Sequence, residues 1–168
     1  MKKTILSSIL LFFVAGITSL FAYVTPESGK VYRIHNVKTN KVIGEDCIAR
    51  QLASVDAAGN DDFKQLWLLR ESSNGYTIQN AYSGQYLHPC AQQSTQIYPT
   101  SAEEAVMYLT QVSGTQYAIG QTTGAYLHLD NSNNIVRWWD KDNTSSQWQF
   151  EEVKVSEEAI SLQQAAFQ

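Results

Sequence analysis

The sequence predicts an all-β fold built from three repeats of roughly 40 residues each. Each repeat opens with a strand in which tyrosine and isoleucine alternate, and a glycine turn precedes that strand. A small polar turn and a second short strand follow, and a strand that in two of the three repeats contains tryptophan closes the repeat. The opening strands begin 44 and 41 residues apart, and they are Tyr32–Asn36, Tyr76–Asn80 and Tyr117–Gln121.

The opening strands have the pattern of a half-buried sheet. In Tyr-x-Ile the two apolar side chains point to the same face, because successive residues of a strand alternate between faces. Aromatic and β-branched residues suit such a surface. Glycine before each strand supplies the positive φ that a tight hairpin turn requires. The short second strands are expected at Val42-Ile43, Tyr86-Leu87 and Tyr126-Leu127, after polar turns at 38–41, 82–85 and 122–125.

The closing strands carry the largest apolar side chains. They are expected at Leu66–Leu69, Met107–Leu109 and Gln147–Phe150. Each aromatic anchor would bury roughly 150–250 Å². A unit of about 40 residues is too small to bury such anchors alone, whereas three units packed around an axis share one core. We therefore expect a single domain at 23–153, with repeats at about 29–72, 73–112 and 113–153.

These features resemble the β-trefoil of the ricin B-type (Gln-x-Trp) lectin family. The family motif stands once in full, as Gln65-Leu66-Trp67. Repeat 3 has Ser146-Gln147-Trp148, and repeat 2 has Val106-Met107-Tyr108, without the Gln and the Trp. The resemblance covers about Gly29–Val153 and implies a β-trefoil. Propeller blades have a similar period, but three of them would not close a ring.

The N-terminal residues 1–22 have the layout of a secretory signal peptide. A basic head (Lys2, Lys3) precedes the apolar run Ile5–Val14, and the small residue Ala22 ends the segment. A membrane anchor is the alternative, but the apolar run is short for a span of roughly 20 residues. We expect a secreted protein, periplasmic or at the cell surface, with no membrane span once the signal is removed.

The C-terminal residues 154–168 favour a short helix. Ser156 is a good N-cap, and Glu157 and Glu158 follow it where a helix N-terminus favours acidic groups. Four apolar residues have helical spacing: Val155, Ala159, Leu162 and Ala166. A linker from Lys154–Gln168 to a further domain or protein partner, or a frayed tail, fits the same residues.

Charge and cysteine content limit the partners. Without residues 1–22 the chain keeps 10 basic and 16 acidic side chains, a formal charge of −6. It has no basic stripe, so we expect no nucleic-acid partner. Cys47 and Cys90 lie at similar points of repeats 1 and 2, and an oxidising compartment permits a disulfide between them. The sequence does not decide whether the two come within reach of each other.

The sequence gives little support for catalysis, a metal or a cofactor. The paired acids are adjacent in sequence, so on a strand they would point to opposite faces. A glycoside hydrolase needs two converging carboxylates, which the sequence does not single out. The three histidines lack metal-ligand spacing, and His88 and His128 are expected as hydrogen-bonded residues at strand ends. We therefore predict no catalytic residues, no metal and no cofactor, with a hydrolase as the remote alternative.

The resemblance implies carbohydrate as the partner. In the family, each sugar pocket uses an Asp after the second strand, a stacking aromatic residue, and a nearby Asn or Gln. Repeat 3 alone has the full set, namely Asp130, Trp138 or Trp139, Asp140 and Asn143. We expect one of the two neighbouring indoles in the core and the other exposed, because neighbouring strand residues face opposite ways.

The other two repeats match the pocket less well. Repeat 1 has Asp46 but lacks an aromatic residue before Phe63, which predicts at most a second, weaker site. Repeat 2 has Cys90 in place of the acid. A non-catalytic sugar-binding module is therefore the prediction. A structural or protein-interaction trefoil that binds no sugar is the alternative, because a fold does not fix a function.

Overall fold

The computed structural model describes residues 21–90, 96–121 and 124–168. Apart from Phe21 and Ala22, the predicted signal peptide lies outside these residues, as does part of the expected turn at 122–125. The elements in chain order are β1 (Tyr23–Val24), β2 (Val31–Asn36), β3 (Val42–Asp46), β4 (Gln51–Val55), the 3₁₀ helix η1 (Phe63–Gln65), β5 (Trp67–Ser72), β6 (Gly75–Asn80), β7 (Tyr86–Leu87), β8 (Thr100–Ser101), β9 (Tyr108–Ser113), β10 (Gln116–Gly120), β11 (Tyr126–Leu129), β12 (Ile135–Trp138), the 3₁₀ helix η2 (Thr144–Ser146), β13 (Trp148–Glu152) and α1 (Glu157–Phe167).

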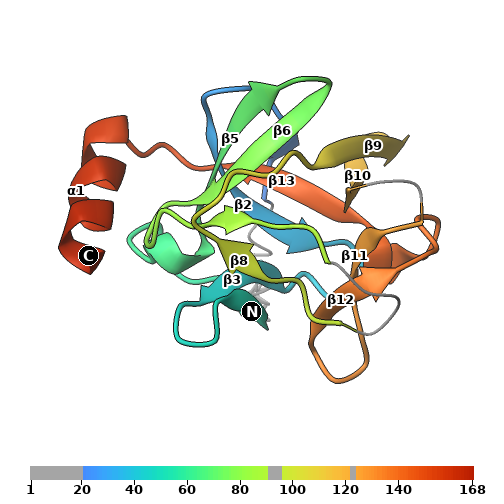
Figure 1. Cartoon of the computed structure of the whole chain (residues 1–168). Coiled ribbons are helices and arrows are strands. Elements are labelled where there is room, and N and C mark those ends of the chain that lie inside the picture. The colour runs from blue at the N-terminus through green and yellow to red at the C-terminus, as the bar shows by residue number, and fades with distance from the viewer. Residues whose placement is uncertain (1–20, 91–95, 122–123) are drawn as a thin grey trace, which may run out of the picture.

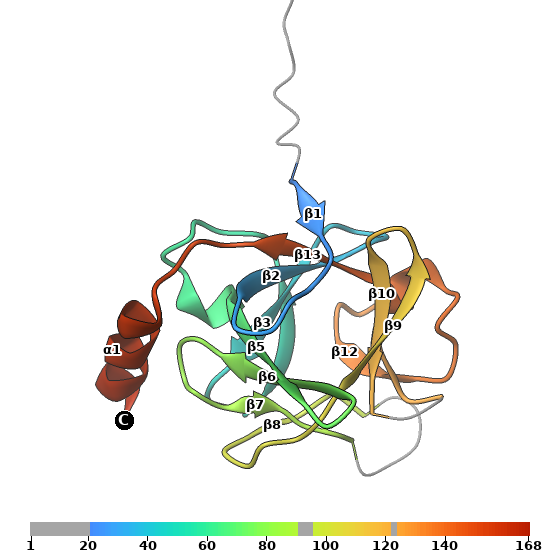
Figure 2. The same cartoon turned by 90° about the horizontal axis from the view of Figure 1, so that it is seen from above.

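Six antiparallel strands close into a barrel in the order β10-β13-β2-β5-β6-β9. A bridge between Tyr76 and Met107 joins β6 to the start of β9 and completes the ring. Three further strand pairs, β3–β4, β7–β8 and β11–β12, lie on the side of the barrel away from the β5–β6 turn (Figures 1 and 2). A bridge between Ile97 and Val136 links β12 to the segment that precedes β8. The arrangement is the predicted β-trefoil.

Two tryptophans at matching positions hold the core together. The largest fully buried side chains include Trp67, Trp148, Tyr32, Tyr98 and Phe150. The indole N–H of Trp67 donates to the carbonyl of Ile43 at 2.8 Å, and that of Trp148 donates to the carbonyl of Leu127 at 3.0 Å. Each bond runs from the closing strand of a repeat to the second strand of the same repeat. The side chains repeat the same interaction, so the pseudo-threefold relation extends beyond the backbone.

Repeat 2 departs from the predicted alignment. Tyr108 was expected as the aromatic anchor of this repeat, but it pairs with Gly120 and is 43 % exposed. Met107 is fully buried instead. Trp67 and Trp148 pair with Asn80 and Asn36, which follow the isoleucine of the opening strand by two residues. The same register in repeat 2 brings Met107 to the core position, so the expected anchor was one residue too late.

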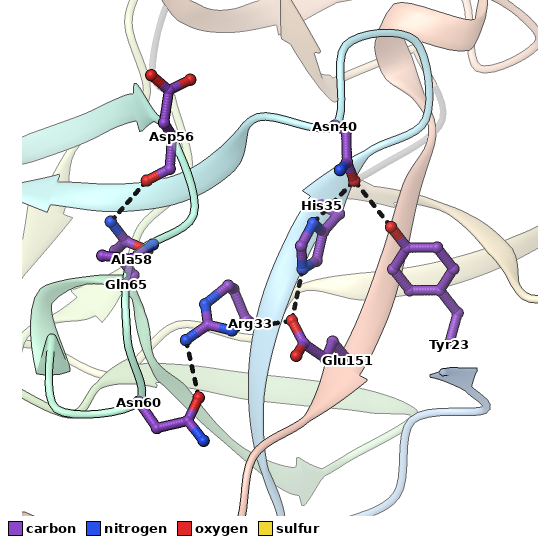
Figure 3. Close-up of polar contacts among 9 residues, drawn as sticks. All are labelled: Tyr23, Arg33, His35, Asn40, Asp56, Ala58, Asn60, Gln65 and Glu151. Atoms are coloured by element: carbon purple, nitrogen blue, oxygen red, sulfur yellow. Dashed lines mark hydrogen bonds and ion pairs between the residues drawn. The ribbon is translucent and has the colours of Figure 1, made fainter. Parts of the chain in front are cut away.

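The glutamine of the Gln-x-Trp motif braces the loop before it. Gln65 accepts a hydrogen bond from the Ala58 N–H and donates to the Asp56 carbonyl, both at 2.9 Å (Figure 3). In repeat 3 the glutamine stands one residue later, and Gln147 donates to the carbonyls of residues 141 and 142 at 3.1 Å. The motif therefore shapes a loop in both repeats, although it is complete only in repeat 1.

The N-terminal strand is tied to the barrel by a partly buried polar cluster (Figure 3). Tyr23 pairs with Glu151, and its hydroxyl donates to Asn40 Oδ1 at 2.8 Å. The same oxygen lies 3.0 Å from His35 Nδ1, while His35 Nε2 lies 2.7 Å from Glu151 Oε2. Arg33 donates to this carboxylate oxygen at 2.9 Å. Arg33 and His35 are buried, so the residues that directly follow the predicted signal peptide belong to the folded domain.

The predicted C-terminal helix is present, but its buried face differs from the expectation. Ser156 is the N-cap, and its hydroxyl accepts from the Ala159 N–H. Leu162, placed on the apolar stripe by its spacing, is 66 % exposed, whereas Ile160 is buried against the barrel. Phe167 meets the ring of Tyr82 edge-on at 5.1 Å. Helix α1 thus lies at the side of the barrel after an extended segment (Figures 1 and 2). Within the described ranges, no helix is long and apolar enough to cross a membrane.

The two cysteines are free thiols, so the disulfide that the sequence permitted is not formed. The two thiols contact different oxygen atoms. Cys47 Sγ lies 3.6 Å from a carboxylate oxygen of Glu45, and Cys90 Sγ lies 3.7 Å from the carbonyl of Ile97. Burial raises the pKa of both thiols to about 11, and the Glu45 charge adds to the effect on Cys47.

Candidate functional site

A cleft of about 320 Å³ opens between repeat 3 and repeat 1. Its walls are the end of β11, the end of β12, the start of η2 and the turn that follows β2. The lining residues are Lys38, His128, Asp130, Asn131, Trp138, Asn143 and Ser145. Three of the five residues predicted for a repeat-3 site therefore lie together here, and they are Asp130, Trp138 and Asn143.

Trp138 is the middle ring of a three-ring stack. Its centroid lies 4.6 Å from that of His128 and 3.9 Å from that of Trp139, with interplanar angles of 17° and 21°. Two rings this close and nearly parallel to a third cannot lie side by side over one face, so they cover its opposite faces. Trp138 is half-buried and Trp139 is 60 % exposed. Trp138 therefore offers the cleft an edge, while the outer face of Trp139 is open.

The expected division of the two indoles holds for Trp139, which is exposed, and is wrong for Trp138, which is half-buried in the stack and not in the core. The expectation assumed a continuous strand, but β12 ends at Trp138, and Trp139 begins the following bend. Trp139 is thereby freed from strand alternation and folds back over its neighbour. Neither indole belongs to the hydrophobic core of the barrel.

Asp130 shapes its own turn and also faces the cleft. Its Oδ1 accepts from the backbone N–H groups of Ser132 and Asn134, both at 2.8 Å. Its Oδ2 receives only a longer contact, 3.4 Å, from the Asn134 side chain. Because a carboxylate oxygen accepts about two hydrogen bonds, Oδ2 retains capacity for a ligand hydroxyl.

Asp46 has the corresponding place in repeat 1. Its Oδ1 accepts from the N–H groups of Ile48 and Ala49, both at 3.0 Å, as Asp130 does in repeat 3. Each carboxylate therefore caps two backbone N–H groups of the turn that follows its strand, although the second N–H belongs to the third residue after Asp46 and to the fourth after Asp130. Asp46 lies in another repeat and takes no part in the cleft.

Asn143 and Asp140 have different positions relative to the cleft. Asn143 lines it and caps η2, where its Oδ1 accepts from the Ser145 N–H at 2.9 Å. Since the carbonyl end of the side chain is used for capping, its Nδ2 is the group that it can offer to a ligand oxygen. Asp140 does not line the cleft. Its Oδ1 accepts from the Asp142 N–H at 2.9 Å, which gives it a turn-forming role.

His128 is held firmly beneath the stack. It is buried, and its Nδ1 lies 2.8 Å from the hydroxyl of Ser146. This contact confirms the expected hydrogen-bonded histidine at a strand end. Burial lowers the pKa of His128, and the nearby Lys38 lowers it further against the opposing pull of Asp130 and Asp140. The neutral ring is therefore favoured at neutral pH.

Four lining residues were not predicted as site residues, namely Lys38, His128, Asn131 and Ser145. Asn131 and Ser145 are adjacent in sequence to the turns that were considered, so their places follow once the turns are known. His128 carried a signal, since it directly follows the second strand of repeat 3. Lys38 comes from the turn of another repeat, and only the closed barrel brings it to the cleft.

The described residues offer no strong case for a metal or a nucleophile. Within 21–90, 96–121 and 124–168, no group of three or more His, Cys, Asp or Glu side chains is placed to hold a metal ion. The His128–Ser146 pair has the composition of a nucleophile and its base, but Ser146 is fully buried. A substrate could not reach its hydroxyl in this arrangement.

The chain is similar in sequence to a family of lectin-like domains and in fold to several solved lectins. Residues 20–97 match the family model described as ricin-type beta-trefoil lectin domain-like. This match includes repeat 1 and much of repeat 2. A search of curated proteins gave no match.

Several solved structures share the fold over most of the chain. The ricin B-like lectin of Macrolepiota procera, in complex with lactose, is 18 % identical, with a TM-score of 0.68 over 77 % of this chain and 100 % of that one. The Rhizoctonia solani agglutinin is 20 % identical, with a TM-score of 0.65 over 79 % and 100 %. The Polyporus squamosus lectin, bound to the epitope Neu5Acα2-6Galβ1-4GlcNAc, is 19 % identical, with a TM-score of 0.64 over 76 % and 50 %. At such identities the likeness establishes the fold, a β-trefoil, and together with the match over residues 20–97 it confirms the resemblance to ricin-type β-trefoil lectin-like domains.

Proposed function

We propose that this protein is a secreted, non-catalytic carbohydrate-binding module whose sugar site is the cleft of repeat 3. The observation that carries the proposal is the exposed indole of Trp139 beside a cleft lined by a carboxylate and an amide. An indole exposed to this extent beside a hollow of the surface favours a ligand-binding role. The lectin-like family and the sugar complexes of similar folds support the same class of ligand.

The cleft has the groups that a sugar needs. Asp130 Oδ2 can accept a hydrogen bond from a hydroxyl, and Asn143 Nδ2 can donate one. Lys38 adds a donor from the opposite wall. Beside the cleft, the exposed face of Trp139 supplies an apolar surface for the C–H side of a sugar ring. Few polar groups on a rigid scaffold are sufficient for such recognition.

The alternative is a structural or protein-interaction trefoil that binds no sugar. The role of Asp130 in its own turn favours this alternative, because Asp46 also accepts from two backbone N–H groups of its turn, in a repeat that lacks the aromatic stack. The exposure of Trp139 favours sugar binding, because a turn alone does not require an exposed indole. Secretion is part of the proposal and rests on the basic head and apolar run of residues 1–22.

A glycan panel tests the proposal. We expect at least one glycan to bind the chain that starts at Tyr23 and to change its tryptophan fluorescence, because Trp139 is the most exposed of the described indoles. Binding to Trp138→Ala and Trp139→Ala proteins is then measured by calorimetry, since the variants lose part of the optical signal. Absence of binding to every glycan, or unchanged affinity in both variants, would favour the structural alternative.

A further inference from the structure

We infer that the outer face of Trp139 is a subsite separate from the cleft, so that the ligand is an oligosaccharide of at least two sugar rings. The inference rests on the proposed function and specifies the size of its ligand. It assigns the cleft to one ring and the indole face of Trp139 to the next.

The stack excludes Trp138 as the platform for a sugar. Its two faces are covered by His128 and Trp139, at centroid distances of 4.6 and 3.9 Å. A sugar ring stacks by laying its C–H groups against an aromatic face, and an edge does not offer that surface. Trp139 has one face against Trp138 and is 60 % exposed, so its outer face is the open surface of this stack.

The open face does not belong to the cleft itself. Trp138 lines the cleft, whereas Trp139, in the bend that follows β12, does not. The polar groups that would fix a sugar, Asp130 and Asn143, lie within the cleft. Because Trp139 is absent from the lining, we assign a single ring held by these groups to the cleft and not to the face of Trp139. A ligand that uses both needs a second ring joined to the first.

The shape of the site makes the proposal specific. The cleft lies between Lys38 of repeat 1 and the residues of repeat 3, and the Trp139 platform stands beside its repeat-3 wall. The ring in the cleft is recognised by hydrogen bonds, whereas the ring on Trp139 is recognised by stacking. Stacking tolerates many sugars that present an apolar face. The cleft therefore selects the identity of one sugar ring, whereas Trp139 favours a ligand that is long enough to have a second ring.

The test compares sugars of different length. Three series are titrated by calorimetry: galactose with lactose, glucose with cellobiose, and N-acetylglucosamine with chitobiose. For the series that binds, we expect the disaccharide to bind the wild-type chain at least tenfold more tightly than the better of its monosaccharides. In Trp139→Ala this advantage should fall below about threefold, while the affinity for the monosaccharide stays the same. Trp139→Phe keeps an aromatic face and should keep most of the advantage.

Two controls keep the result interpretable. Tyr108→Ala removes another exposed aromatic side chain, on β9, and should leave every affinity unchanged. Because Trp139→Ala uncovers one face of Trp138, the double variant Trp138→Ala/Trp139→Ala removes any replacement platform. Its disaccharide advantage should also be lost.

The outcomes separate this inference from the function beneath it. Equal affinities for mono- and disaccharides, or an equal loss for both in Trp139→Ala, would overturn the separate subsite while sugar binding stands. Failure of all three series and of the wider glycan panel would overturn the proposed function, and the subsite with it.

Discussion

The indole N–H of Trp148 donates at 3.0 Å to the carbonyl of Leu127, the residue next in sequence to His128, which lines the candidate site. Leu127 precedes His128, whose ring supports the aromatic stack. Trp67 makes the matching bond to Ile43 at 2.8 Å in repeat 1, away from the cleft. The two tryptophans are thus equivalent for the fold, whereas only Trp148 is close to the site.

Replacing each of these tryptophans by Phe should separate stability from binding. Both variants leave a buried carbonyl without its donor, and such a loss costs about 1–3 kcal/mol. We expect a similar fall in the free energy of unfolding for Trp148→Phe and Trp67→Phe in urea titrations. Sugar affinity should fall in Trp148→Phe alone, because its bond positions the strand that carries His128. Equal affinities in the two variants would show that the floor of the cleft does not depend on this bond.

Asp130 and Asp46 offer a matched pair for the carboxylate. An Asp→Asn change keeps an oxygen that can accept the two backbone N–H bonds of the turn and removes the charge. We therefore expect small effects on the melting temperature in both variants. Asp130→Asn should weaken sugar binding about tenfold or more, since hydrogen bonds to charged groups contribute about 1.5–3 kcal/mol. Asp46→Asn should bind as the wild type does, and a loss in this variant would point to a second site in repeat 1.

The sequence predicted the fold because the information that specifies it is local and repeated. Tyrosine and isoleucine alternate in every opening strand, and the structure buries all of them except Tyr76, which is partly buried against the core. The failure at Tyr108 also has a local cause. In repeat 2 the core position is occupied by Met107, which has no aromatic ring. Aligning the three repeats by their aromatic residues therefore placed Tyr108 at that position, one residue too late. Spacing alone likewise placed Leu162 rather than Ile160 on the buried face of α1, because contact with the barrel decides which side of a helix is covered.

The site was predicted less completely, because it is built from two repeats and from side-chain geometry. Asp130, Trp138 and Asn143 were identified from their order in repeat 3. Lys38 was not, since it lies far away in sequence and reaches the cleft only when the barrel closes. The stacking of Trp139 on Trp138 depends on where β12 ends, which the sequence does not mark. Sequence patterns therefore identified repeat 3 as the location of the site. The exposed face of Trp139 could be recognised only from the folded structure.

The two thiols should react slowly in the native protein. Their pKa is raised to about 11, mainly by burial, from an ordinary value of 9.0. Two pKa units reduce the thiolate fraction at pH 8 by roughly a hundredfold, and the thiolate is the reactive form. We expect labelling by iodoacetamide to be correspondingly slower than in a model peptide. Two thiols should react promptly in denaturant without reductant. Detection of fewer than two would show that a disulfide forms after all.

Protonation of His128 should weaken the fold at acidic pH. Burial lowers its pKa below the ordinary value of 6.5, so the unfolded chain binds this proton more readily than the folded one. Stability that the neutral ring contributes is therefore present above about pH 6.5 and is lost as the pH falls toward the lowered pKa. The slope from one such group cannot exceed about 1.4 kcal/mol per pH unit. Urea titrations between pH 7.5 and 5 should show a shallower decline for His128→Asn than for the wild type. Parallel curves would assign the acid sensitivity to other groups.

Helix α1 should detach without unfolding the trefoil. Ile160 is its buried side chain among Val31, Leu66 and Leu68, whereas Leu162 on the same helix is 66 % exposed. A charge at position 160 would be buried without a partner, so Ile160→Asp should release the helix. We expect rapid proteolytic cleavage after the barrel at a nearly unchanged far-UV spectrum of the β-sheet. Leu162→Asp places the same charge in solvent, and it should resist the protease as the wild type does. If Ile160→Asp instead unfolds the whole domain in one step, α1 is an integral part of the trefoil core, and its docking contributes to the stability of every repeat.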